Sequence, residues 1–259
     1  MAAPHERSVA TPAPRPWREC VGYEALNPAP WPVRDAEAVV WFDVDNTLYS
    51  HLATRIGDHM QDRIRAYFQS LGLSNDEAEH LHQHYYKEYG LAIRGLVMHH
   101  AIDPLDYDRK CDASLPLEKL LHPDDALVAL LRAIDRRRFR VFALTNAYKT
   151  HARRVLKLLH IEEFFDGVVF CDYTIPNFSC KPEHEFYHAA DQAIGVRGGM
   201  RQYFVDDSLA NVRAASAFGW SACVHYDENS ALEHPAKEDG VTTISSVAQL
   251  RDVWPELFS

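Results

Sequence analysis

Two carboxylates lie two positions apart at Asp43 and Asp45, directly after the apolar run of residues 39–42. A run of β-branched and aromatic residues predicts a buried parallel strand, and side chains two apart on extended backbone point the same way. Neighbouring carboxylates repel each other unless a cation lies between them or one keeps a proton. The pair therefore indicates metal-dependent or acid–base chemistry. The structural alternative is a strand end followed by an Asx turn, with Thr47 as a cap.

Polar side chains also follow two later apolar runs. Thr145 and Asn146 come after residues 140–144, and Asp206 and Asp207 come after residues 202–205. The carboxyl ends of parallel strands share one edge of a sheet, where ligands bind in open α/β folds. Lys181, in a loop before a predicted helix, can join them there. Carboxylates suit Mg²⁺, whereas lysine and threonine suit phosphate oxygens.

A receiver domain uses similar parts, namely acidic residues, a threonine and a lysine. Such a domain carries its acidic pair early in the chain, and here the pair at Asp206 and Asp207 comes last. The chain, with 259 residues, is also far longer than such a domain.

Alternating strand and helix patterns dominate the second half of the chain, which predicts an α/β fold with a doubly wound parallel sheet. We assign residues 36–53 and 123–259 to this core. The predicted elements after residue 123 are helices at 124–137, 149–159, 182–194 and 209–218 and strands at 140–144, 167–171, 202–205 and 222–225.

Residues 54–122 form a helical insert that interrupts this rhythm. Apolar residues recur at three- and four-residue spacing from Ile56 to Leu71, and Gly72 ends that helix. Ser74 is a candidate cap for the next helix, which runs toward Gly90. An insert of this length is too long for an ordinary loop between a strand and a helix. We expect a helical cap domain over the strand end that carries Asp43.

The first 35 residues contain half of the 14 prolines. Proline interrupts both helices and central strands, so we expect residues 1–35 to be a flexible N-terminal arm, with Trp17, Tyr23 and Trp31 attaching its second half to the body.

The net charge of −10 argues against nucleic acid or an anionic membrane surface as a partner. No apolar segment is long enough to span a membrane. The five scattered cysteines form no zinc spacing and suit a reducing compartment, so we expect a location in the cytoplasm, with the nucleus as the alternative.

The chemistry-bearing segments occur in an order that looks like the four motifs of the haloacid dehalogenase-like hydrolase superfamily. The long helical insert resembles the first type of cap in that superfamily. Residues 38–226 more narrowly resemble the fungal pyrimidine 5′-nucleotidases. The segments that carry the resemblance are Asp43-Val44-Asp45-Asn46-Thr47-Leu48-Tyr49, residues 86–96, Thr145-Asn146-Ala147-Tyr148-Lys149, Cys171-Asp172-Tyr173, Lys181-Pro182 and Asp206-Asp207.

The resemblance implies catalysis by Asp43, Asp45, Thr145 and Lys181. Asp43 would form an aspartyl phosphate, and Asp45, with a raised pKa, would protonate the leaving oxygen and then deprotonate water. Thr145 and Lys181 would stabilise the transferring phosphoryl group. The implied cofactor is Mg²⁺, held by Asp43, by the backbone carbonyl of Asp45 and by Asp206, with Asp207 contacting it through water or supporting the other ligands.

The resemblance also implies that Asn146, Arg94, Tyr86 and Lys87 bind the substrate. Tyr86 lies among aromatic residues at helical spacing, which pack into a cap core more often than they stack on a base. Lys87 and Arg94 could equally be surface charges.

The expected activity is Mg²⁺-dependent hydrolysis of a nucleoside 5′-monophosphate, with UMP or CMP preferred. The alternatives are the same mechanism on lysophosphatidate or a sugar phosphate, or a non-catalytic binding protein. Dehalogenation is disfavoured because it needs neither a metal nor the proton of Asp45. The oligomeric state is left open.

Overall fold

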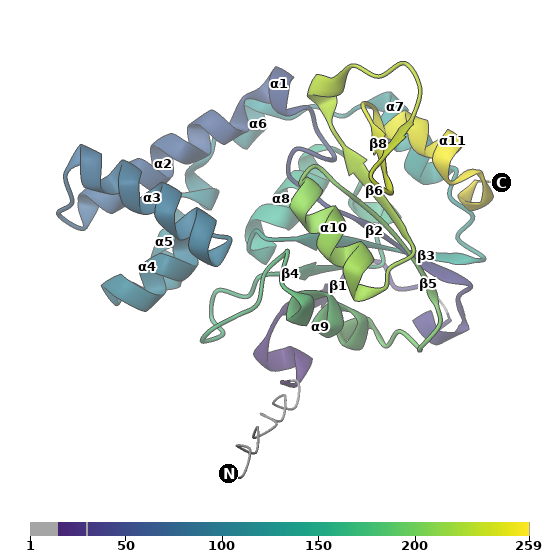
Figure 1. The fold of residues 1–259 in the computed structure, drawn as a ribbon, viewed down its shortest axis with the longest axis horizontal. Coiled ribbons are helices and arrows are strands. Elements are labelled where there is room, and N and C mark those ends of the chain that lie inside the picture. The colour runs from purple at the N-terminus through teal and green to yellow at the C-terminus, as the bar shows by residue number, and fades with distance from the viewer. Residues whose placement is uncertain (1–14, 30, 259) are drawn as a thin grey trace, which may run out of the picture.

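The computed structural model describes residues 15–29 and 31–258. Its centre is an eight-stranded sheet with the order β1-β4-β3-β2-β5-β6-β8-β7 (Figure 1). The strands are β1 (Gly22–Ala25), β2 (Ala38–Phe42), β3 (Phe139–Thr145), β4 (Gly167–Phe170), β5 (Arg201–Asp206), β6 (Ala222–Tyr226), β7 (Ala236–Glu238) and β8 (Val241–Ile244). All neighbouring strands are parallel except at the two edges, where β1 and β7 run antiparallel to β4 and β8. The predicted α/β fold is confirmed.

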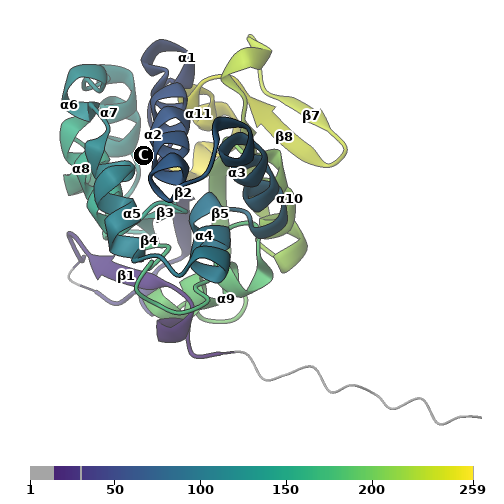
Figure 2. The same ribbon diagram turned by 90° about the vertical axis from the view of Figure 1, so that its left-hand side faces the viewer.

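Helices cover both faces of the sheet, with α8 on one side and α9 and α10 on the other (Figure 2). The helices are α1 (His51–Thr54), α2 (Ile56–Ser70), α3 (Asn75–Tyr89), α4 (Ala92–His100), α5 (Pro104–Lys110), α6 (Leu117–Leu120), α7 (Asp125–Arg132), α8 (Lys149–Leu158), α9 (His184–Ile194), α10 (Leu209–Phe218) and α11 (Leu250–Val253). Since both faces are covered, every residue of β2 and β3 is buried. Trp41 in β2 stacks on Trp220 at 5.4 Å between ring centroids.

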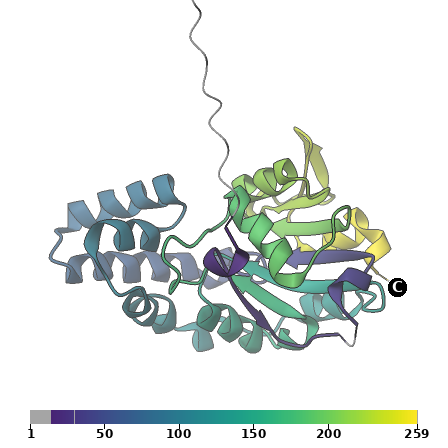
Figure 3. The same ribbon diagram turned by 90° about the horizontal axis from the view of Figure 1, so that it is seen from below.

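Helices α2 to α5 form a separate lobe beside the sheet, which we call the cap (Figures 1 and 3). A capping box at Ser74 and Glu77 starts α3, and Gly90, with φ of 77°, ends it. The predicted boundary of the insert at residue 122 lies beyond this lobe. Helix α6 contacts α8 of the core, and Arg154 on α8 donates to the Leu115 carbonyl at 2.7 Å.

The second half of the predicted N-terminal arm is part of the folded body. Strand β1 pairs with β4, and Cys20 and Val21 are buried. Arg15 forms an ion pair with Glu185 of α9 at 2.6 Å. Trp17 and Tyr23 pack against the core and Trp31 lies against Arg140, so the expectation that these residues attach this half of the arm to the body is confirmed. Prolines flank the short edge strand but do not interrupt it, so the expected flexibility is wrong for residues 15–29 and 31–35. Residues 1–14 and 30 lie outside the described part of the chain.

Two helices are shorter than predicted. Helix α9 begins at His184 instead of Pro182, because Glu183 has extended backbone angles (φ −68°, ψ 135°). Helix α7 ends at Arg132 instead of Arg137, because the Asp135 side chain accepts the backbone N–H of Arg137 and forms a turn.

Candidate active site

The ends of three strands bring the predicted polar residues together. Asp43 follows β2 directly, while Thr145 and Asp206 are the last residues of β3 and β5. Because β2 lies between β3 and β5, these ends are neighbours. The backbone N–H of Asp43 donates to the Val205 carbonyl at 3.0 Å, which extends the pairing of β2 and β5 into the site.

Lys181 links two of the strand ends from a loop. Its Nζ donates to Asp43 Oδ1 at 2.6 Å, to Asp206 Oδ2 at 2.7 Å and to the Leu144 carbonyl at 2.8 Å. Burial alone would lower the pKa of Lys181, but the Asp206 and Asp43 carboxylates raise it. The lysine is therefore charged and is held at the centre of the site.

Asp43 is buried and is oriented from both sides. Its Oδ1 accepts Lys181, and its Oδ2 accepts the Thr47 hydroxyl at 2.9 Å. Burial raises the pKa of Asp43 well above its usual range, the nearby charge of Lys181 opposes this shift, and Asp206 and Asp207 add to it. A further cation beside Asp43 would favour its anionic, nucleophilic form.

Three carboxylates offer oxygen ligands for such a cation. Oxygens of Asp43, Asp206 and Asp207 lie within 4.8 Å of one another. Burial and the charge of Asp206 raise the pKa of Asp207 to about 7. Hard oxygen donors with excess negative charge fit Mg²⁺. When bound, Mg²⁺ would neutralise charge between the carboxylates and a phosphate group.

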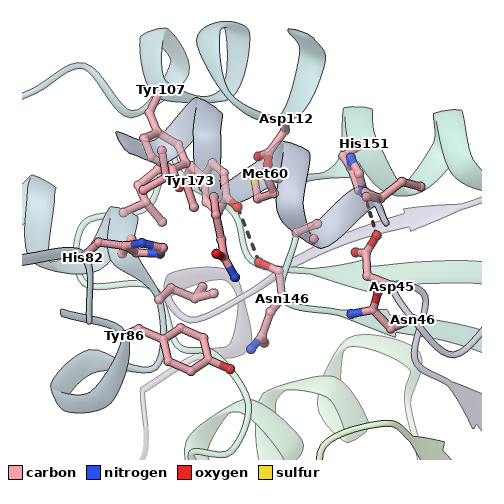
Figure 4. Close-up of a pocket in the computed structure, with 18 of the residues that line it drawn as sticks. Asp45, Asn46, Met60, His82, Tyr86, Tyr107, Asp112, Asn146, His151 and Tyr173 are labelled. Carbon is pink, nitrogen blue, oxygen red and sulfur yellow. Dashed lines mark hydrogen bonds and ion pairs between the residues drawn. The ribbon is translucent and has the colours of Figure 1, made fainter. Parts of the chain in front are cut away.

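The environment of Asp45 differs from the one expected from the sequence. Its Oδ1 accepts the Tyr49 hydroxyl at 2.7 Å and lies 2.7 Å from His151 Nε2 on α8 (Figure 4). Burial acts to raise the pKa of Asp45, but the charge and hydrogen bond of His151 and the Tyr49 hydroxyl outweigh burial and lower it. The raised pKa predicted for Asp45 is therefore wrong for this arrangement. Burial acts to lower the pKa of His151, but the charge and hydrogen bond of Asp45 raise it to about 9. The proton of the pair therefore lies on the imidazole.

Thr145 and Asn146 position the loop groups around this centre. The Thr145 hydroxyl accepts the backbone N–H of Ala147 at 2.9 Å and keeps its own proton for a ligand. The Asn146 side chain accepts the Lys181 N–H at 2.8 Å and donates to the Lys181 carbonyl at 3.0 Å. Asn146 therefore also holds the backbone of the lysine loop, a role that the sequence analysis did not assign.

The supporting roles of three residues were not predicted from the sequence. Thr47 joins Asp43 to the Asp207 N–H, which it accepts at 3.1 Å. Asn211, in the first turn of α10, donates to Asp206 Oδ1 at 2.9 Å. Thr47 and Asn211 each lie within five residues after a strand-end carboxylate. This closeness in sequence could have indicated that they support the site. His151 carried no local signal, because it comes from a helix that follows a different strand.

The predicted cap residues fall into two groups. Tyr86 is 63% exposed and borders the site, and Lys87 also lines it. Arg94, in contrast, lines neither of the two cavities between cap and core. Its guanidinium is engaged by Glu183 at 2.6 Å and by the Tyr89 carbonyl at 2.9 Å. Arg94 thus bridges the cap and the lysine loop.

Two adjoining cavities open between cap and core. The core cavity, of about 550 Å³, is lined by the strand-end residues, including Asp43, Thr145, Lys181 and Asp207. The cap cavity, of about 510 Å³, is lined by helices α2 to α5 and by residues of the core (Figure 4). The residues that line both cavities are Asp45, Asn46, Tyr86, Leu91 and Asn146.

A family model described as haloacid dehalogenase-like hydrolase matches residues 38–219, which include every strand-end residue of the site. The chain belongs to this family. The matched residues of this haloacid dehalogenase-like hydrolase include the cap and the strand ends that carry Asp43, Thr145 and Asp206.

One relative of this hydrolase is Phosphate metabolism protein 8 of Saccharomyces cerevisiae. The two are 37% identical over 207 residues, which are 76% of this chain and 64% of the yeast protein. The hydrolase therefore spans less than two thirds of the length of this relative.

Solved structures share the fold of this hydrolase. A HAD phosphatase from Thermococcus onnurineus superposes with a TM-score of 0.55 at 22% identity, over 83% of this chain and 97% of that one. A magnesium-bound HAD hydrolase from Bacillus subtilis gives 0.51 at 16% identity, over 85% and 99%. At these identities the likeness concerns the fold.

Among the helices of the described part of the hydrolase, none is both long and apolar enough to cross a bilayer.

Proposed function

We propose that this hydrolase is a Mg²⁺-dependent phosphatase that converts nucleoside 5′-monophosphates, preferably UMP or CMP, to nucleoside and phosphate. The observation that carries the proposal is the junction of the two cavities at Asp45 and Asn146. A phosphate group in the core cavity would leave its organic part facing the cap cavity. The volume of about 510 Å³ lies in the range of roughly 300–1,000 Å³ typical of small-ligand sites.

The nucleophile in this proposal is Asp43. A carboxylate oxygen attacks phosphorus, the bond to the nucleoside O5′ breaks, and an aspartyl phosphate forms. Lys181, the Thr145 hydroxyl and the Asn146 backbone N–H stabilise the transferring oxygens. Asp43, Asp206 and Asp207 would hold the Mg²⁺ that offsets the repulsion between two anions.

Asp45 acts on the leaving group together with His151. The proton on His151 Nε2 passes to Asp45 as Asp45 protonates O5′, across the 2.7 Å contact of the pair. Asp45 then takes a proton from the water that attacks the aspartyl phosphate, and inorganic phosphate is released. The two groups thus share one proton through both halves of the cycle.

A second candidate substrate is lysophosphatidate. Ile56, Met60, Ile64 and Ile93 line the cap cavity, and an apolar wall of this kind would suit an acyl chain. We further expect the protein to act in the cytoplasm, where the free thiols of its five cysteines stay reduced.

A substrate panel tests the proposal. Phosphate release would be measured with Mg²⁺ for UMP, CMP, AMP, GMP, lysophosphatidate and a hexose phosphate. We expect kcat/KM to be highest for UMP or CMP, by about 10-fold or more over the other substrates, a difference on the order of 1.4 kcal/mol. A preference for lysophosphatidate would replace the nucleotide assignment with the second candidate.

A further inference from the structure

Asp112 has an unusual environment in the wall of the cap cavity. It lies in a single turn of 3₁₀ helix (Asp112–Ser114) between cap and core, and it is 3% exposed. Its Oδ2 is buried and accepts no hydrogen bond from any residue in the described part of the chain. A buried carboxylate oxygen without a donor is costly, so a ligand donor at this position would explain why it is tolerated.

The neighbours of Asp112 place it toward the reacting end of the cavity. Burial raises the pKa of Asp112 to about 7, the charge of His151 and the nearby Tyr173 hydroxyl oppose this shift, and Asp108 and Asp45 add to it. Asp112 and the Asp45–His151 pair line the same cavity (Figure 4). A group bound by Asp112 would thus lie near the oxygen that leaves phosphorus.

Asp108, four residues before Asp112 in the chain, provides a contrast. It is also buried, but both of its carboxylate oxygens accept the Thr150 hydroxyl at 3.2 Å. Asp108 lies outside the residues that line the cap cavity. Two buried carboxylates therefore lie close together in sequence, and Asp112, which lines the cavity, is the one with an unpartnered oxygen.

The chemistry of a carboxylate selects what it can bind. Donors on a bound ligand would hold Asp112 in its anionic form. The anion presents two acceptor oxygens and no donor, so its best partner offers two donors side by side. The vicinal hydroxyls of ribose meet this requirement. The pairing edge of uracil does not, because its single N–H lies between two carbonyl oxygens that would face the carboxylate.

We propose that Asp112 binds the vicinal sugar hydroxyls of the leaving nucleoside and thereby selects ribonucleotides. This inference rests on the proposed nucleotidase function and adds the residue that recognises the sugar. The sugar is the part of a nucleotide nearest the ester oxygen, which agrees with the position of Asp112 near Asp45. The role is one of substrate binding, and the Asp45–His151 pair carries the proton.

The test compares substrates as well as variants. Asp112→Asn keeps the size of the side chain and replaces one acceptor with a donor, and Asp112→Leu removes both acceptors. Asp108→Asn is the matched control. For each protein, kcat/KM would be measured with UMP, dUMP and p-nitrophenyl phosphate, and the melting temperature would show whether the fold is intact.

We expect the ratio of kcat/KM for UMP to that for p-nitrophenyl phosphate to fall at least 20-fold in Asp112→Leu and less in Asp112→Asn. The ratio should stay within twofold in Asp108→Asn. The preference of the wild-type protein for UMP over dUMP, expected to be about 10-fold, should shrink in both Asp112 variants because dUMP lacks one hydroxyl.

An unchanged ratio in Asp112→Leu, with UMP still hydrolysed well, would overturn this inference and leave the nucleotidase function standing. Equal losses on UMP and dUMP would overturn the contact with paired hydroxyls. A wild-type protein that hydrolyses p-nitrophenyl phosphate but neither nucleotide would refute the proposed function, and this inference would fall with it.

Discussion

The guanidinium of Arg94, on α4 of the cap, lies 2.6 Å from the carboxylate of Glu183, two residues after Lys181. The same nitrogen contacts Cys180 Sγ at 3.3 Å, and the other Glu183 oxygen accepts the Cys180 N–H at 3.0 Å. The Asn146 side chain forms hydrogen bonds with both the backbone N–H and the carbonyl of the next residue, Lys181. The cap is therefore tied directly to the loop that carries the central lysine.

This tie changes what a substitution at Arg94 should do. Arg94→Ala removes a charge-assisted hydrogen bond, so the free energy of unfolding should fall by on the order of 1.5–3 kcal/mol. The value of kcat/KM should also fall, because the loop that positions Lys181 loses this support. Because the bond supports the Lys181 loop, UMP and p-nitrophenyl phosphate should be affected alike. Steady-state kinetics with both substrates would measure this.

Arg109→Ala is the matched control for Arg94, because Arg109 makes exposed ion pairs within the cap and should matter little. The exchange Arg94→Glu with Glu183→Arg should recover part of the lost activity. A loss confined to UMP would instead support the predicted contact between Arg94 and the nucleotide.

Asp43→Asn should abolish turnover, because an amide cannot attack phosphorus at a useful rate. We expect a loss of at least about 1,000-fold in phosphate release. Circular dichroism should show an unchanged fold. Activity above about a thousandth of the wild-type value would rule out Asp43 as the nucleophile.

Removal of divalent metal should abolish the phosphatase activity of the protein. EDTA should stop phosphate release, Mg²⁺ should restore it, and Ca²⁺ should restore it poorly because its coordination is larger and looser. Mg²⁺ should also raise the melting temperature, since it relieves the repulsion among Asp43, Asp206 and Asp207. Full turnover in excess chelator would contradict the metal-dependent route.

His151→Gln should lower kcat with little change in KM. The substitution removes the group that holds the shared proton against Asp45, and general acid–base catalysis typically contributes about 10²–10⁴-fold. We expect a loss of roughly 100-fold. Lys157→Ala, an exposed position on the same helix, is the control for effects of altering α8.

Asp191 should make stability depend on pH. It lies on α9, accepts Trp220 Nε1 at 3.3 Å and has a second oxygen that is buried without a described partner. Burial raises the pKa of Asp191 to about 7, so the native state binds a proton that the unfolded state releases from about pH 4 upward. The free energy of unfolding should therefore fall as the pH rises from about 4 through 7.

Asp191→Asn should remove this dependence. The amide stays neutral, so the variant should exceed the wild-type protein by on the order of 1–2 kcal/mol at pH 8 and approach it at pH 5. Urea unfolding at the two pH values would measure the difference. A wild-type advantage at pH 8 would show that Asp191 is stabilised as the anion.

The strand-end residues could be predicted from sequence because their placement follows from a few short-range rules. An apolar run ends at Asp43, another at Asp206, and parallel strands align such ends at one edge of a sheet. The helices of the insert were equally readable, since Ser74 and Gly90 mark the start and end of α3.

The contacts of single side chains could not be predicted in this way. His151 and Arg94 act across more than 80 positions of the chain, on Asp45 and Glu183, and no local pattern records such a pairing. The lowered pKa of Asp45 depends on one of these contacts, so it also escaped prediction. Strand β1 was missed because its proline-rich flanks hid a short run that pairs only with a distant strand.

Strand β1 has a further consequence for how the molecule behaves among other molecules. It covers the outer edge of β4, and Gly22 permits the close approach, since a Cβ there would come within 2.2 Å of the Phe170 ring. An uncovered strand edge is a template for aggregation, because its free N–H and C=O groups pair with strands of other chains. A protein expressed from residue 36 would keep its catalytic groups and lose this shield, so self-association would limit its use.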